Sequence, residues 1–425
     1  MSAKISGIRG MNDILPEDTP LWQRVESVLT ESVKAYGYQE LRVPVVERTE
    51  LFKRSIGEVT DIVEKEMYTF ADRNDQSLTL RPEATAGIVR AGIAHGLFHN
   101  QKQKLWSAGP MFRYEKPQKG RYRQFHQFDV EVFGYAGPDI DAELLMISAR
   151  IWKELGLKDI ALQINSLGTP ESRVSYREEL IDYFSAHSGQ LDEESLARLE
   201  RNPMRLLDSK NPDIQALIGD APHITDHLDT ESAEHFSELQ ELLQAANISF
   251  STNTRLVRGL DYYTRTVFEW VTDKLGAQGA VCSGGRYDGL VEHLGGRATP
   301  AIGWAIGLER LVELYKSCGN GAGVPGLDAY LVAVGDEAAK QALILAESLR
   351  DEAPGLNIEV NLGGGSFKSQ FKRADKSGAK VALILGEEEL AARRVGIKPL
   401  RHEADQQTVA WEQSATIISS IRGDA

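Results

Sequence analysis

The spacing of hydrophobic residues predicts a helix near the N-terminus, followed by an interrupted strand. Between residues 21 and 36, apolar side chains recur every three or four positions, and Gly37 follows as a stop signal. The next segment, residues 41–55 (LRVPVVERTELFKRS), begins like a strand but contains Pro44. Because proline cannot donate a hydrogen bond to a sheet, we expect this strand at an edge or an interface.

Three later segments alternate between apolar and polar residues with the period of a strand: residues 78–83, 111–115 and 125–133. The polar loop KPQKGRYR (residues 116–123) separates the last two. A strand, a loop with proline and glycine, and a second strand predict a long antiparallel hairpin.

The remaining chain predicts a helical insertion, further strands and a second domain. Charged helical patterns dominate from about Asn165 to Asn253. Strand-like sequence returns at residues 256–271 and 277–283, and residues 301–316 run from a glycine-rich strand into a helix. The small residues 317–325 suggest a linker. Beyond it, strands at 329–335, 357–362 and 380–386 alternate with helices at about 337–352 and 367–376, and Ser366 is placed to cap the second helix.

This order of elements predicts an α+β protein with two domains. We expect a catalytic-type domain over residues 1–325, with the insertion at about 170–253, and an α/β domain with a largely parallel sheet over residues 326–425.

Composition and charge narrow the classes of protein. The chain has 425 residues, 42% of them hydrophobic, and a formal charge of −14, which argues against a simple basic nucleic-acid binder but leaves room for a local basic patch. Cys282 and Cys318 are far apart and lack a metal-ligand spacing, as expected in a reducing cytosol. No signal peptide or membrane-spanning stretch is evident, so we expect a cytoplasmic protein without membrane contact.

The polar positions of the alternating segments carry the candidate chemistry. They include Arg81, Glu83, Arg113, Gln127 and Glu131, and the intervening loop adds Lys116, Lys119, Arg121 and Arg123. A salt-bridged surface sheet would explain any one strand about as well, but three such strands beside a basic loop favour a charged ligand. Arginine suits phosphate, and glutamate suits an ammonium group or magnesium. No P-loop occurs, and the glycines at 363–365 predict a plain turn before a helix.

At this point the chain resembles class II aminoacyl-tRNA synthetases. Residues 109–134 resemble the second motif of that class, residues 300–314 with Arg310 resemble the third, and the Pro44 region resembles the first, which builds the dimer interface in the family. Four segments are similar specifically to histidyl-tRNA synthetases: RGMNDILPED (9–18), TLRPEATAG (79–87), LVRGLDYY (256–263) and SGGRYDGLVEHLGG (283–296). The C-terminal domain resembles an anticodon-binding domain.

The resemblance implies a histidine–tRNA ligase, which uses ATP to activate L-histidine, transfers it to tRNA(His), and releases AMP and diphosphate. It implies an antiparallel sheet flanked by helices, a homodimer, and Mg²⁺ with ATP. The implied catalytic residues are Arg258 and Arg113. The residues implied to bind ATP are Arg113, Arg121, Phe125 and Arg310. The residues implied to bind histidine are Glu83, Thr85, Gln127, Glu131, Tyr262, Tyr263 and Tyr287. The residues implied to bind tRNA are Gln118 and Arg123. No protein ligand for a metal is assigned.

Each of these residues also has an ordinary structural explanation. Tyr262 and Tyr263 could be core aromatics, Arg258 a structural ion-pair donor, and the lysines at every fourth position of residues 368–376 a solvated face. The joint pattern favours the functional interpretation. A pocket that satisfies both imidazole nitrogens would reject other amino acids without editing.

Two other functions fit the sequence less well. The first is a catalytically silent relative of the synthetases that binds histidine and regulates another enzyme. Such relatives lack the C-terminal domain and have usually lost the catalytic residues, whereas this chain retains Arg113, Arg258 and Arg310. A synthetase for another amino acid is opposed by the LVRGLDYY and SGGRYDG segments. The chain departs from the usual family pattern at Ala84, Tyr114 and the Phe128-Asp129-Val130 stretch, which bears on the fine shape of the pocket.

Overall fold

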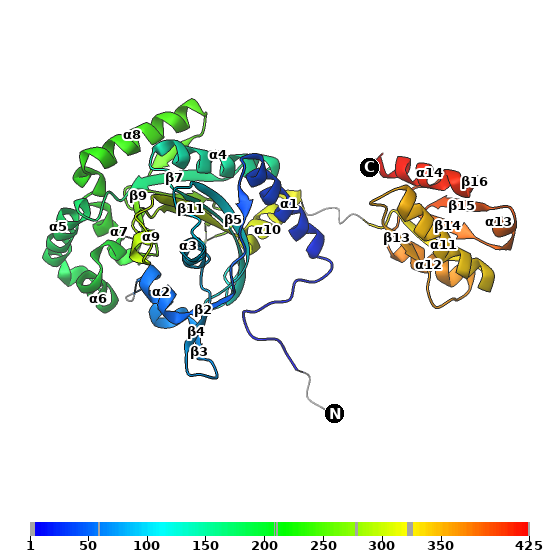
Figure 1. Ribbon diagram of the computed structural model, residues 1–425, viewed down its shortest axis with the longest axis horizontal. Coiled ribbons are helices and arrows are strands. Elements are labelled where there is room, and N and C mark those ends of the chain that lie inside the picture. The colour runs from blue at the N-terminus through cyan, green and yellow to red at the C-terminus, as the bar shows by residue number, and fades with distance from the viewer. Residues whose placement is uncertain are drawn as a thin grey trace. The chain divides into compact units, whose positions relative to one another are not determined.

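The chain divides into two compact units in the computed structural model, Met1–Gly321 and Ala322–Ala425 (Figure 1). The structure describes residues 5–57, 60–207, 209, 211–276, 279–320 and 326–423. The two units are described separately below.

The first unit is built on a mostly antiparallel, eight-stranded sheet. Its strand order is β1 (Gln39–Glu40), β5 (Gln103–Phe112), β6 (Gln124–Phe133), β11 (Ala301–Gly307), β10 (Ala280–Arg286), β9 (Thr264–Val271), β7 (Ala161–Ser166) and β8 (Phe250–Thr252). Only the β1–β5 and β7–β8 pairs at its two edges are parallel. Strands β5 and β6 form the predicted hairpin. Its first strand begins earlier in the chain than the predicted residues 111–115, at Gln103, and ends at Phe112.

Alternation along β6 gives this sheet two different faces. Phe128, Val130 and Val132 are buried in a core with helices α1 (Thr19–Ala35) and α4 (Pro138–Glu154). Gln127, Asp129 and Glu131 therefore point to the opposite face. Helix α10 (Leu308–Tyr315) follows β11 as predicted, and its buried leucines join the same core.

The segment around Pro44 is divided between two sheets. Strand β1 ends before the proline, and β2 (Val46–Arg48) follows it as an edge strand of a small sheet with β4 (Ser77–Leu80) and β3 (Tyr68–Ala71). The predicted edge position is confirmed, and α2 (Thr49–Ile56) and the π-helix Ile62–Glu66 come next in this region.

Of residues 78–83, which were expected to form a strand, only residues 78–80 do so, and they belong to the small sheet. Strand β4 ends at Leu80 in the small sheet, and Arg81 joins the two sheets through the bonds Arg81 N to Val45 O (2.8 Å) and Phe112 N to Arg81 O (3.0 Å). Glu83 lies beyond the strand, just before α3 (Thr85–Ala94), so the chain reaches the polar face of the main sheet through a turn.

Helices fill the insertion between β7 and β8. They are α5 (Ser172–Ala186), α6 (Glu193–Arg201), α7 (Pro212–Gly219) and α8 (Thr230–Ala245), with 3-10 turns at Ser188–Gln190, Pro203–Leu206 and Ile224–His227. Asp192 and Asp229 cap α6 and α8 by accepting bonds from Ser195 N and Ser232 N. The charged helical patterns assigned to residues 165–253 therefore also span the end of β7 and the whole of β8, and the predicted insertion at about 170–253 includes β8.

Two further predictions require correction. Within residues 256–271, only residues 264–271 form a strand, and residues 256–263 form the loop that carries Arg258. Strand β10 begins at Ala280, and residues 277 and 278 lie outside the described residues. Helix α9 (Leu290–His293) follows β10. Of the expected linker, residues 317–320 belong to the π-helix Lys316–Asn320, and residues 321–325 lie outside the described residues.

The second unit has a five-stranded sheet of order β13 (Ile358–Val360), β12 (Ala329–Ala333), β14 (Val381–Leu385), β15 (Arg394–Pro399) and β16 (Gln407–Ala410). Its first three strands are parallel and connected by α11 (Asp336–Glu352) and α12 (Phe367–Lys376), as predicted. Ser366 caps α12, and the glycines at 363–365 have positive φ angles. The antiparallel strands β15 and β16 and the helices α13 (Glu387–Ala391) and α14 (Trp411–Gly423) were not predicted.

Candidate active site

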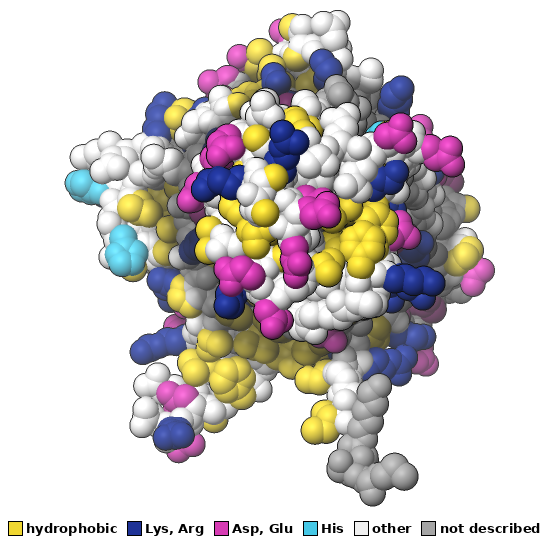
Figure 2. Space-filling model, turned by 90° about the vertical axis from the view of Figure 1, so that its right-hand side faces the viewer, with side chains coloured by type: hydrophobic (Ala, Val, Ile, Leu, Met, Phe, Trp, Pro, Cys, Tyr) yellow, Lys and Arg dark blue, Asp and Glu magenta, His cyan; other side chains and the backbone are white. Residues whose placement is uncertain are grey.

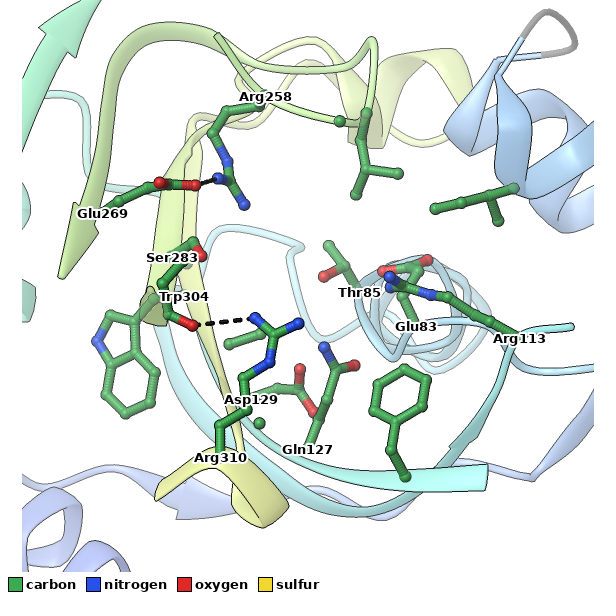
Figure 3. A pocket seen from close by; sticks show the side chains of 18 of the residues that line it. Glu83, Thr85, Arg113, Gln127, Asp129, Arg258, Glu269, Ser283, Trp304 and Arg310 are labelled. Atoms are coloured by element: carbon green, nitrogen blue, oxygen red, sulfur yellow. Dashed lines mark hydrogen bonds and ion pairs between the residues drawn. The ribbon is translucent and has the colours of Figure 1, made fainter. Parts of the chain in front are cut away.

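A cavity of about 390 Å³ lies over the polar face of the main sheet (Figure 3). Its lining contains the predicted residues Glu83, Thr85, Arg113, Arg121, Phe125, Gln127, Glu131, Arg258, Tyr262, Tyr263, Tyr287 and Arg310. Gln118 and Arg123 do not line it. Gln118 is exposed on the hairpin loop, and Arg123 stacks its guanidinium 3.8 Å from the centre of the Tyr114 ring.

One end of the cavity is organised around Glu131. Its carboxyl group is buried and accepts hydrogen bonds from Thr85 Oγ1 (2.5 Å) and from the Tyr287 hydroxyl. Burial and, to a smaller extent, the charge of Glu83 raise the pKa of Glu131 to about 8, although the two hydrogen bonds oppose this shift. Gly303 faces this carboxyl group on the neighbouring strand, and a side chain at that position would overlap it. A neutral or cationic group with its own donor is the partner that such a site favours.

Beside Glu131, several buried polar atoms have no partner among the described residues. Glu83 Oε1 accepts a bond from Ala86 N (2.9 Å), but Glu83 Oε2, Gln127 Oε1 and Asp129 Oδ2 accept none. Leaving buried polar atoms unpaired costs about 1–3 kcal/mol each. Acceptors grouped in one cavity therefore point to a ligand that donates hydrogen bonds.

Arg258 approaches the cavity from the loop before β9. Its Nη1 atom pairs with Glu269 of that strand, and its guanidinium lies 5.6 Å from the centre of the Tyr263 ring. Its Nε atom is buried without a partner among the described residues. Burial tends to lower the pKa of Arg258, but Glu269 and the neighbouring Tyr263 and Tyr262 together outweigh burial, and the pKa is raised. The side chain is thus a cation whose buried Nε donor has no partner among the described residues.

Three more arginines line the cavity. Arg113 Nε donates to Pro82 O (2.8 Å), and its guanidinium lies 5.2 Å from the centre of the Phe125 ring. Arg310 donates to Gly120 O and Ala280 O, both at 3.0 Å, and Arg121 pairs with Glu115. Burial and then the charges of Arg121 and Arg113 lower the pKa of Arg310. Mutual repulsion among like charges indicates a site for a polyanion.

Comparisons with known proteins identify the family. The sequence model described as "Histidyl-tRNA synthetase" matches residues 10–311. The chain belongs to the histidyl-tRNA synthetase family. It is a histidine–tRNA ligase, and a second match, "Anticodon binding domain", covers residues 328–421.

Solved structures agree with this assignment. The chain is 36% identical to apo histidyl-tRNA synthetase from S. aureus, with a TM-score of 0.81, over 98% of this chain and 100% of that one. A histidyl-tRNA synthetase from Nostoc is 22% identical, with a TM-score of 0.71 and coverage of 98% and 99%. A Bacillus halodurans protein described as an ATP phosphoribosyltransferase regulatory subunit/histidyl-tRNA synthetase is also 22% identical, with a TM-score of 0.66 and coverage of 91% and 99%. The last two matches support the fold alone.

A buried ionic network supports the histidyl-tRNA synthetase pocket from behind. Arg286 is fully buried, and its Nε donates to both carboxylate oxygens of Asp141 at 2.9 and 3.1 Å. His235 of α8 reaches the same carboxylate through Nε2 at 2.8 Å, and Arg286 Nη1 donates to Asp288 Oδ1 at 2.9 Å. Because Tyr287 lies between Arg286 and Asp288, this network helps to fix the hydroxyl that bonds Glu131.

Sequence reasoning missed several residues of the synthetase cavity. Glu269, Asp129, Glu115, Glu309 and Ser283 all line it. Glu269 occupies a polar position in an otherwise mostly apolar strand, which was the available signal in the sequence. Its partner Arg258 lies on a preceding loop, however, and no pattern along the chain paired the two.

Proposed function

We propose that the cavity binds ATP and L-histidine side by side and that Arg258 and Arg113 assist formation of histidyl-adenylate. The observation that supports this most directly is the arrangement of charge. Arginines from three separate segments and carboxyl groups from β6 and the turn before α3 line one buried cavity. Such an arrangement suits a polyphosphate next to a cationic amino acid.

The histidine subsites follow from the buried acceptors. Glu83, Thr85 and Gln127 would hold the α-ammonium group, because Glu83 Oε2 and Gln127 Oε1 lack partners among the described residues. Glu131 and Tyr263 would bond the two imidazole nitrogens, with Tyr262 and Tyr287 completing the walls. A neutral imidazole has one donor and one acceptor, which a carboxylate and a hydroxyl can satisfy together.

The ATP subsites follow from the arginines. Phe125 would stack on adenine, Arg113 would contact the α-phosphate, and Arg121 and Arg310 would hold the outer phosphates. The Phe125 ring and the Arg113 guanidinium are neighbours. Their proximity suits adenine on Phe125 and the α-phosphate of the same ATP beside Arg113.

In the first step, an oxygen of the histidine carboxylate attacks the α-phosphorus, and the bond to the bridging oxygen breaks to release diphosphate. Arg258 would stabilise the charge that develops on the α-phosphate, because its Nε donor is free among the described residues. In the second step, a terminal hydroxyl of tRNA attacks the carbonyl carbon and AMP leaves.

Mg²⁺ would accompany ATP and neutralise its outer phosphates. The described residues contain no group of three or more His, Cys, Asp or Glu side chains suited to a metal ion. Magnesium commonly uses only one or two carboxylates and takes its other ligands from phosphate and water. We therefore assign it no protein ligands and derive no step from it.

For tRNA recognition, Gln118 and Arg123 would contact the 5′ end of tRNA(His). Gln118 is exposed at the tip of the hairpin loop, and in the second unit the exposed lysines 368, 372 and 376 form a positive stripe on α12. A contact to phosphate would make charging salt-dependent.

A homodimer and a cytoplasmic location complete the proposal. The small sheet around Pro44 exposes Val46 and Phe70, which are 37% and 44% accessible and suit an apolar interface. Among the described residues, no helix is both long and apolar enough to cross a membrane. Light scattering would measure the mass of the particle in solution, and a monomer at micromolar concentration would contradict the dimer.

The decisive experiment is ATP–diphosphate exchange measured with each standard amino acid, followed by charging of tRNA(His). We expect exchange with histidine alone and charging that requires the same active protein. Exchange with another amino acid but not with histidine would overturn the assignment of the cavity. Exchange without charging would localise the error to the tRNA contacts.

A further inference from the structure

The carboxyl group of Asp129 has no part in the function proposed above. It lies on β6 between Gln127 and Glu131, points to the same face, and lines the cavity (Figure 3). Its side chain is only 1% accessible, and its Oδ2 atom has no hydrogen-bond partner among the described residues. A buried carboxyl oxygen without a hydrogen-bond partner costs stability, which points to a role toward a ligand.

The packing around Asp129 leaves room for such a ligand. In the sheet, Asp129 is opposite Ser107 on β5 and Ala305 on β11, and both are small residues. The cation that most strongly offsets the charge of Asp129 is Arg81, whose Nε and Nη1 donate to the backbone oxygens of Pro110 (2.9 Å) and Val43 (3.2 Å). Arg81 therefore offsets the charge of Asp129 through space, while its described hydrogen bonds go to backbone oxygens.

The negative charges around Asp129 favour a cation as its partner. Burial, followed by the negative charges of Glu131 and Glu83, raises the pKa of Asp129 well above its ordinary value, while Arg81 and Arg113 oppose this. A positive group placed among these carboxyl groups would relieve their repulsion and stabilise the ionised form of Asp129. At the other end, Glu131 already accepts bonds from Thr85 and Tyr287, so it has less capacity for an additional cation.

We propose that Asp129 is a further substrate-recognition residue, whose carboxylate contacts the α-ammonium group of histidine from the floor of the cavity. This inference rests on the proposed function of the cavity and extends its ammonium subsite from Glu83, Thr85 and Gln127 to a second carboxylate. The position between Gln127 and Glu131 places Asp129 beneath the middle of the substrate, between the residues assigned to its two ends.

The test compares two ligands that differ only in the amino group: L-histidinol and 3-(imidazol-4-yl)propanol. Calorimetry would measure their dissociation constants for wild type, Asp129→Asn and Asp129→Gly, and circular dichroism would monitor the fold. Because a hydrogen bond to a charged group contributes about 1.5–3 kcal/mol, we expect both variants to lose about 10- to 150-fold in affinity for histidinol. The deaminated compound should bind each variant nearly as well as wild type.

Glu83→Gln and Glu131→Gln are the matched controls. Glu83→Gln should also weaken histidinol selectively, whereas Glu131→Gln should weaken both compounds. The contrary result is that Glu83→Gln weakens histidinol alone while the Asp129 variants weaken both compounds equally or leave both affinities unchanged. That result would overturn the role of Asp129 and leave the proposed cavity intact. If the amino group gives no advantage in wild type, the ammonium subsite itself is wrong.

Discussion

Replacing Arg258 with alanine tests the central catalytic role. The substitution removes a guanidinium whose Nη1 pairs with Glu269 and whose Nε is unpaired among the described residues. Loss of one positioned donor to a developing oxyanion typically lowers kcat by about 10²–10³-fold, or roughly 3–4 kcal/mol. Histidine binding should change much less, because the carboxyl groups and tyrosines assigned to histidine remain in place.

The same substitution leaves Glu269 without its partner beside the proposed phosphate site. That residual charge could slow the reaction by repelling ATP, which is a different cause from the loss of a donor. The double variant Arg258→Ala/Glu269→Gln separates the two causes because it removes the unpaired charge. If the donor itself matters, the double variant should stay as slow as the single one.

The assay is ATP–diphosphate exchange, with kcat and KM determined for both substrates and histidine affinity measured separately by calorimetry. Glu269→Gln alone should have a smaller effect, because Arg258 remains charged. The reasoning is refuted if Arg258→Ala exchanges at the wild-type rate. It is equally refuted if the double variant recovers to near wild type, since repulsion would then explain the loss.

Three other substitutions test the pocket and its support. Glu131→Gln should raise the histidine KM roughly 10- to 100-fold in the exchange assay. Because the pKa of Glu131 is raised to about 8, its contribution to the stability of the ligand-free protein is fully present below its unfolded-state pKa and is lost as the pH rises toward 8. In wild type, the free energy of unfolding measured with denaturant should therefore fall between pH 5 and 8 by up to about 1.4 kcal/mol per pH unit more than in Glu131→Gln. An equal slope in the two proteins would contradict this. Gly303→Ala should place a methyl group against the Glu131 carboxyl and cost about 1–3 kcal/mol of histidine affinity, so an unaltered histidine KM would count against the geometry. Asp141→Asn should destabilise the first unit by about 3 kcal/mol because Arg286 is fully buried beside it, whereas a loss below about 1 kcal/mol, measured by urea unfolding, would show that the network is not needed.

Local pattern determined much of the secondary structure. Helix α12 occupies the predicted residues 367–376, and α1 and β6 differ from their predicted ranges by only one or two residues. In each case the signal is short-range: a helical or strand period, a capping serine or a stop glycine. The family motifs likewise occur in contiguous segments, so the sequence pointed to the family, and all the residues predicted to bind histidine or ATP line the cavity.

Tertiary structure decided which strands pair and which charges compensate one another. The Pro44 segment and residues 78–83 carry ordinary strand patterns, but their division between the main and the small sheet depends on partners far along the chain. The pairing of Arg258 with Glu269, and the lack of a hydrogen-bond partner for Asp129 Oδ2 among the described residues, likewise became visible only in three dimensions. The physical reason is that strand pairing and burial are properties of residues distant in sequence. Periodicity reports which face a side chain occupies but not what lies opposite it.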